Sequence, residues 1–125
     1  MALLTAESIL AAEDFVYDIV ECPEWGGEVR IRSLSGAQRA TLKKAIDAGH
    51  DNIDETVCVM AIVDADGNRI FTQQQINVLS RKNTSVISRI AIRVLEISGM
   101  RDRDKALKDA EKKSGQTQSD DSSFD

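Results

Sequence analysis

The chain has 125 residues, 42% of them apolar and 30% charged, which is typical of one globular domain with a single modest core. The formal net charge is −5, so we expect no general binding to nucleic acid. No apolar run is long enough to cross a membrane, and the acidic N-terminal segment does not look like a signal peptide. These features predict a protein that stays in the cytoplasm and has no membrane partner.

Charge is distributed unevenly along the chain. Residues 1–28 contain seven acidic residues and no Lys or Arg, whereas the next segment is basic. The basic residues are Arg30, Arg32, Arg39, Lys43 and Lys44. This patch is a candidate docking surface for an acidic protein. The alternative interpretation is a solvated strand face beside a solvated helix face.

The first elements are predicted from local signals. Thr5 is an N-cap for a short helix that ends near residue 12. Residues 15–22 are rich in β-branched and aromatic side chains, and residues 23–27 contain one proline and two glycines, which predicts a β-hairpin. In the returning strand Val29 and Ile31 fall on one face.

Arg30 and Arg32 fall on the other face of that strand, a period of two that indicates one buried side and one solvated side. Ser35 then predicts the start of a helix over residues 36–48, and Gly49 its end.

Lone aromatic residues are frequent at binding hot spots, so Trp25 in the hairpin turn is a candidate recognition residue. The alternative is that its ring closes the core.

The middle of the chain is ambiguous. Residues 53–63 contain β-branched residues that favour a strand, but apolar residues also repeat at helical spacing. We predict a helix from the length of the segment, with a short strand as the alternative. A turn over residues 64–68 follows, then an extended segment and a short helix capped by Thr72 that runs to about residue 80.

The last strong pattern predicts a helix over residues 85–98. Its apolar arc covers about half of the circumference, which is wider than a surface helix needs. The arc contains Val86, Ile87, Ile90, Ala91, Val94, Leu95 and Ile97. Ile92 lies outside the arc and is expected to be exposed. This surplus of apolar surface predicts self-association into a homo-oligomer.

The fold class that follows is α+β and mostly helical, with a small antiparallel β-hairpin near the N-terminus packed with about four to five helices. We expect residues 1–100 to form the folded domain. Residues 101–113 are predicted to be a charged, marginally helical extension. Residues 114–125, including Phe124, are predicted to be a disordered acidic and polar tail.

Candidate chemistry is weak at every position, and the sequence predicts no enzyme, no catalytic residue, no cofactor and no metal. Asp64, Asp66 and Asn68 have the spacing of an EF-hand start, but Arg69 and Gln75 stand where Gly and Glu belong. A β-turn is the ordinary interpretation. The only histidine, His50, lacks the neighbouring ligands of a zinc site. Cys22 and Cys58 are interpreted as small buried apolar residues rather than a disulfide.

Two stretches carry a resemblance to a known family. PEWGGEVRIRSLSG and VDADGNRIFT, followed by an amphipathic helix and a polar tail, resemble the G-type tail assembly chaperones of long-tailed bacteriophages with non-contractile tails. The likeness spans roughly residues 14–100 and also favours a helix over residues 53–63.

The resemblance implies a non-enzymatic factor that binds the phage tape-measure protein and helps recruit tail tube subunits. It also implies a location in the host bacterial cytoplasm and absence from the mature virion. Candidate partner-binding residues are Trp25, Arg30, Arg32 and Ile92. Two alternatives remain open: a small structural tail or head-completion protein retained in the virion, and an acidic regulator that mimics nucleic acid.

Overall fold

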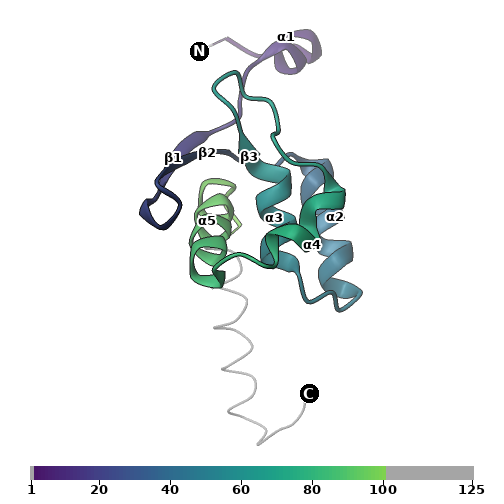
Figure 1. Cartoon of the computed structure of the whole chain (residues 1–125). Coiled ribbons are helices and arrows are strands. Elements are labelled where there is room, and N and C mark those ends of the chain that lie inside the picture. The colour runs from purple at the N-terminus through teal and green to yellow at the C-terminus, as the bar shows by residue number, and fades with distance from the viewer. Residues whose placement is uncertain (1, 101–125) are drawn as a thin grey trace, which may run out of the picture.

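The computed structural model describes residues 2–100 and shows a three-stranded antiparallel sheet packed with helices (Figure 1). The fold is therefore α+β and mostly helical, as predicted. The expectations for residues 101–113 and 114–125 lie outside the described residues. The elements are α1 (Ala6–Ala11), β1 (Tyr17–Cys22), η1 (Pro23–Trp25), β2 (Gly27–Arg32), α2 (Gly36–Asp47), α3 (Ile53–Ala61), β3 (Ile62–Val63), η2 (Gln73–Gln75), α4 (Ile76–Leu79) and α5 (Thr84–Ile97).

The predicted hairpin is confirmed. Strands β1 and β2 pair in an antiparallel register that places Val20 opposite Val29 and Ile19 opposite Arg30. The connection is one 3₁₀ turn, η1, followed by Gly26 with φ of 81°. A left-handed residue at this position reverses the chain, and glycine adopts that conformation without steric cost.

A third strand adds to the predicted hairpin. Residues 53–63 were ambiguous between helix and strand, and the structure contains both: α3 ends at Ala61, and β3 pairs with β2 through Ile62 opposite Ile31. A two-residue strand has no periodicity of its own. It exists because β2 offers a free edge where α3 ends.

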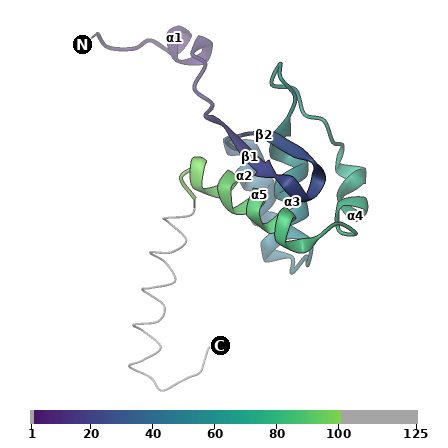
Figure 2. The same ribbon diagram turned by 60° about the vertical axis from the view of Figure 1, so that its left-hand side comes forward.

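The core lies between the inner face of the sheet and helices α3 and α5, which pack against each other (Figure 2). The largest side chains with less than 2% exposure include Ile31, Leu42, Ile62, Ile87 and Ile90. Cys22 and Cys58 are both free and fully buried, which confirms their interpretation as core residues. Burial raises the pKa of the Cys58 thiol to about 12.

The prediction of self-association rested on surplus apolar surface along α5, and the structure shows that this reason is wrong. Five of its seven residues, from Val86 to Val94, are buried in the core, and Leu95 and Ile97 pack against it. The chain's own sheet and α3 cover the arc, so it leaves no surplus apolar surface. The exposed apolar residues lie elsewhere, most of all near the N-terminus.

A capping box joins three elements. The Ser35 hydroxyl accepts a hydrogen bond from the Gln38 amide, and the Gln38 side chain accepts one from the Ser35 amide. The side chain of Gln38 also donates through Nε2 to the Met60 carbonyl at 3.2 Å and accepts through Oε1 from the Arg32 guanidinium at 3.3 Å. Gln38 therefore ties α2 to α3 and β2 as well as starting its own helix.

The loop after β3 is the expected β-turn. The Gly67 amide donates to the Asp64 carbonyl at 3.0 Å, and Gly67 has φ of 88°. The Asp64 carboxylate accepts hydrogen bonds from the amides of Asp66 and Asn68. The Asp64 carboxylate therefore stabilises the turn by accepting hydrogen bonds from its backbone amides. The tip packs closely on Tyr17, whose hydroxyl would lie 3.1 Å from a Cβ at Gly67.

Candidate interaction surface

A groove of about 860 Å³ separates the edge strand β1 from helix α5. We call it the β1–α5 groove. Its walls come from segments that are more than 60 residues apart in the chain, so only the packing of α5 under the sheet creates it. It is lined by Ile19, Val20, Glu21, Pro23, Ser85, Ser88, Arg89, Ile92, Arg93 and Glu96.

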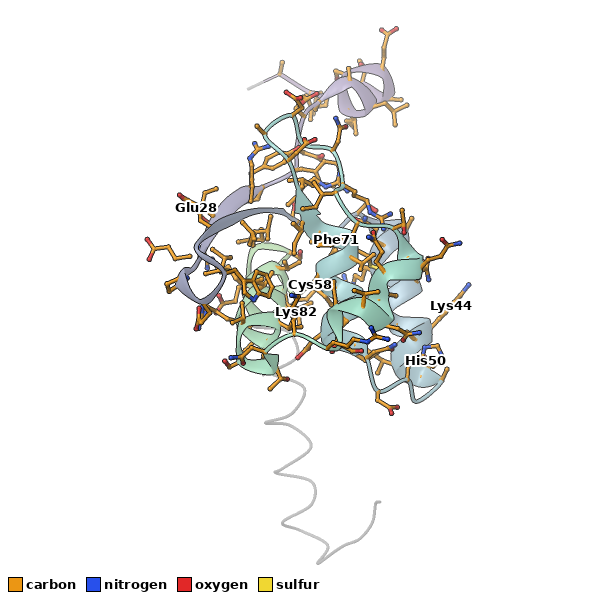
Figure 3. All side chains as sticks on the ribbon, in the orientation of Figure 1. Glu28, Lys44, His50, Cys58, Phe71 and Lys82 are labelled. Carbon is orange, nitrogen blue, oxygen red and sulfur yellow. The ribbon has the colours of Figure 1, made fainter. Side chains whose placement is uncertain are left out.

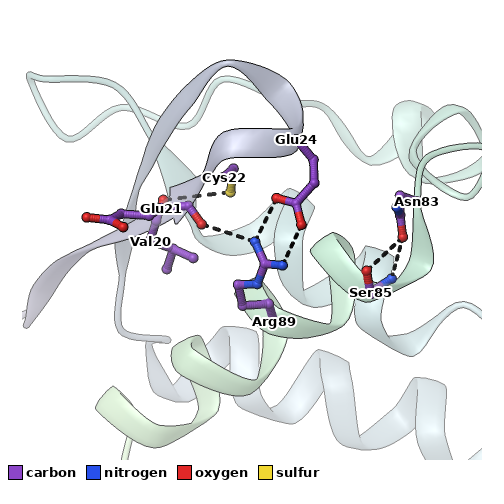
Figure 4. Close-up of polar contacts among 7 residues, drawn as sticks. All are labelled: Val20, Glu21, Cys22, Glu24, Asn83, Ser85 and Arg89. Atoms are coloured by element: carbon purple, nitrogen blue, oxygen red, sulfur yellow. Dashed lines mark hydrogen bonds and ion pairs between the residues drawn. The ribbon is translucent and has the colours of Figure 1, made fainter.

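Arg89 connects the two walls of the groove by hydrogen bonds (Figure 4). Its guanidinium makes two hydrogen bonds to the Glu24 carboxylate, at 3.0 and 2.7 Å, and a third to the Glu21 carbonyl at 3.2 Å. This bidentate contact lowers the pKa of Glu24 to about 2. It also satisfies a carbonyl on the open edge of β1, which would otherwise be available to another strand.

Arg93, one helical turn further along α5, makes a second connection between the two walls. Its Nε donates to the Asp18 carboxylate at 2.6 Å, and Nη1 contacts Glu96 at 3.2 Å. The hydrogen bond from Arg93 lowers the pKa of Asp18. Asp18 also accepts the Ile19 amide at 2.8 Å, so a second polar group on the β1 edge is occupied.

Ile92 lies on α5 between the two arginines, and its side chain is 36% exposed. The expected exposure is confirmed, and the structure places Ile92 in the groove rather than on an isolated surface. Ile19, which is 47% exposed, lines the groove from the edge of β1, but its pairing with Arg30 places its side chain on the outer face of the sheet. Ile92 is thus an exposed apolar side chain flanked by the paired Arg89 and Arg93, an arrangement suited to contact with a protein surface rather than with a small polar ligand.

Trp25 lies in η1 at the turn of the hairpin, where it is 38% exposed and outside the core cluster. The alternative in which its ring closes the core is therefore wrong. Pro23, in the same turn, lines the β1–α5 groove. The hairpin turn thus borders the groove that contains Ile92.

Arg30 and Arg32 lie on the opposite face of the sheet. The Arg30 guanidinium is 4.1 Å from the centroid of the Tyr17 ring and donates to the carbonyls of Asp64 and Ala65. The Arg32 guanidinium is 4.2 Å from the centroid of the Phe15 ring. Cation–π stacking and these hydrogen bonds hold both side chains half-buried. The sheet face is therefore not a simple solvated surface.

The structure thus separates the four candidate residues into two regions. Ile92 belongs to the β1–α5 groove, Trp25 borders it, and the two arginines lie on the other face. Sequence reasoning missed Arg89 and Arg93. Their spacing of four residues places them on one helix face, and the acidic first segment supplies their partners, but the sequence does not show which acids they meet.

Among residues 2–100, no group of three or more His, Cys, Asp and Glu side chains is placed to hold a metal ion. In that same part of the chain, no helix has the length and apolar character needed to cross a bilayer. His50 is exposed in the loop after α2 (Figure 3).

Comparison with solved structures finds a similar fold. The bacteriophage HK97 tail assembly chaperone superposes with a TM-score of 0.59 at 20% sequence identity, covering 73% of this chain and 90% of that chain. No protein-family model matches the sequence, and no curated protein matches it. At 20% identity the likeness concerns the fold. The chain therefore shares its fold with a bacteriophage tail assembly chaperone.

Proposed function

We propose that this protein is a G-type tail assembly chaperone that binds the phage tape-measure protein and helps recruit tail tube subunits, without catalysis. The observation that carries the proposal is the fold shared with the HK97 tail assembly chaperone, which extends over 90% of that chain. The motifs PEWGGEVRIRSLSG and VDADGNRIFT add support, because they resemble such chaperones.

The β1–α5 groove is the surface we assign to the tape-measure protein. It offers Ile92 as an apolar contact, and Trp25 borders it as an aromatic anchor. The two arginines of the groove, Arg89 and Arg93, are already paired within the chain, so a partner would not need to neutralise them. The contact should therefore depend mainly on apolar surface.

Co-expression tests the proposal. The tape-measure protein of the same phage should be soluble and co-purify when this protein is present, and should precipitate when it is absent. Ile92→Asp should reduce the co-purified amount at least about tenfold, because it places a charge in an apolar contact. Val78→Asp is the matched control, since Val78 is exposed on α4 and does not line the groove. Equal solubility of the tape-measure protein with and without this chain would refute the role.

Location provides a second test. We expect the protein in the host cytoplasm during assembly and absent from purified virions, which mass spectrometry of particles can measure. Stoichiometric retention in particles would instead identify a structural tail or head-completion protein. The coding region should also lie between the genes for the tube protein and the tape-measure protein.

A further inference from the structure

The N-terminal arm, residues 2–14, presents apolar side chains that its own domain does not cover. Helix α1 contains no buried residue, and Leu3, Leu4, Ile9 and Leu10 are 96%, 72%, 55% and 85% exposed. Yet the helix is well capped, because Thr5 and Ser8 form a reciprocal capping box. The arm is therefore a short ordered element whose apolar side chains contact no core.

A second groove lies on the other side of the domain, where α2 faces η2 and α4. We call it the α2 groove; its volume is about 550 Å³. Two small side chains, Ala45 on α2 and Ala48 at its C-cap, leave room for large ones from a partner. The lining residues are Thr41, Lys44, Ala45, Ala48, His50, Asn52, Thr56, Gln73, Gln74, Ile76 and Asn77.

The charges of the arm and the α2 groove are complementary. Residues 2–14 contain Glu7, Glu13 and Asp14 and no basic residue. The groove lining contains Lys44 and no acidic residue. Asp51 and Glu55 line an adjacent hollow that shares His50, so the favourable end for an acidic arm is the Lys44 end.

The position of the arm shows whether it can dock into the α2 groove of its own molecule or only into that of another copy. Helix α1 stands away from the body at one end of the molecule, and His50 lies at the opposite end (Figures 1 and 3). The arm of one molecule therefore does not reach its own α2 groove. We propose that the arm of one copy docks into the α2 groove of a second copy, with leucines over Ala45 and Ala48 and acidic residues toward Lys44.

This contact has a defined symmetry. The donor uses its arm and the acceptor uses a different surface, so a pair joined by one contact retains one free groove on the donor and one free arm on the acceptor. Such heterologous contacts continue until they close as a ring or extend as a helical array. The β1–α5 groove takes no part, so the tape-measure contact assigned above remains available in the assembly.

Sedimentation tests the proposal with matched pairs of variants. The wild-type protein should be larger than a monomer at tens of micromolar, a concentration that detects micromolar affinity. Leu4→Ser/Leu10→Ser in the arm and Ala48→Glu in the groove should each weaken association at least roughly tenfold. Lys44→Glu should weaken it more than Lys43→Glu, because both residues are exposed on α2 but only Lys44 lines the groove. Circular dichroism should show unchanged folding in each case.

A mixing experiment identifies the contact directly. The arm variant and the groove variant should each be monomeric, but their equimolar mixture should form heterodimers and nothing larger, because one intact arm meets one intact groove. A monomeric wild-type protein or a mixture that stays monomeric would overturn the proposal. So would unchanged assembly after deletion of residues 2–13. If a monomeric wild type loses the tape-measure protein on arm mutation, the arm binds that partner and not a second copy. Failure of the arm contact leaves the co-expression test of function unaffected.

Discussion

Helices α1 and α5 are both capped by polar side chains, but they differ completely in burial. Thr5 starts α1 with a capping box and Asn83 starts α5, yet α1 has no buried residue whereas α5 buries five. Capping satisfies the amides that a helix leaves unpaired at its start, and it therefore determines where a helix begins. Burial is a separate property, and it determines which helix stabilises the domain.

The largest expected effect concerns the buried residues of α5. Ile90→Ala should destabilise the domain by about 2–5 kcal/mol, because Ile90 is fully buried and the substitution leaves a cavity. Ile92→Ala, two residues away on the same helix, should cost less than about 1 kcal/mol because that side chain is 36% exposed. Urea unfolding of both variants measures the difference. Similar losses would show that α5 is not oriented as described.

Local sequence signals predicted where helices and turns lie, but they did not predict which elements contact one another. The proline and glycines after β1 predicted the hairpin, and Ser35 and Thr72 predicted two helix starts that the structure confirms. Each of these signals acts within a few residues, so the sequence displays it directly. A short strand was only the alternative to a helix over residues 53–63, and the sequence did not show that β3 follows α3, because two residues have no pattern and pair only where β2 offers an edge.

The residues of the candidate surface were harder to predict from the sequence, because they come together only through contacts between distant parts of the chain. Arg89 meets Glu24 across 65 residues and Arg93 meets Asp18 across 75, so only the folded domain shows these pairs. The exposure of Ile92 was predictable from its angle on the helix. The apolar arc beside it was misjudged, because helix periodicity gives the width of an apolar face but not what covers it.

An intermediate effect is expected at the contact that joins three elements. Gln38→Ala should destabilise the domain by about 1–3 kcal/mol, since it removes partners of the Ser35 amide, the Met60 carbonyl and the Arg32 guanidinium together. Gln74→Ala is the matched control, because Gln74 is exposed in η2. Thermal unfolding compares the two. A loss for Gln38→Ala no greater than for Gln74→Ala would refute this role of Gln38.

A smaller effect is expected from pH. The pKa of Glu24 falls from 4.5 to about 2 in the folded protein, so its ion pair with Arg89 stabilises the fold above pH 4.5. That stabilisation is lost as pH falls from 4.5 toward 2, and Asp18 shifts in the same direction. Urea midpoints between pH 7 and pH 3 should therefore fall less steeply for Glu24→Gln than for the wild type. Glu28→Gln, a change at an exposed β2 carboxylate, is the control that should keep the wild-type slope.

The smallest effect is expected in the arm. Helix α1 has the same kind of capping box as α2, but α1 buries no side chain in the core. Ser35→Ala should cost about 1 kcal/mol of domain stability, because α2 unfolds with the domain. Thr5→Ala removes the equivalent capping box but should change the unfolding free energy by less than about 0.5 kcal/mol, because α1 contributes no buried side chain. Both must be measured on dilute monomer, where docking between copies does not contribute. An equal loss for Thr5→Ala would mean that the arm packs on its own domain, and it would remove the basis for an arm that reaches a second copy.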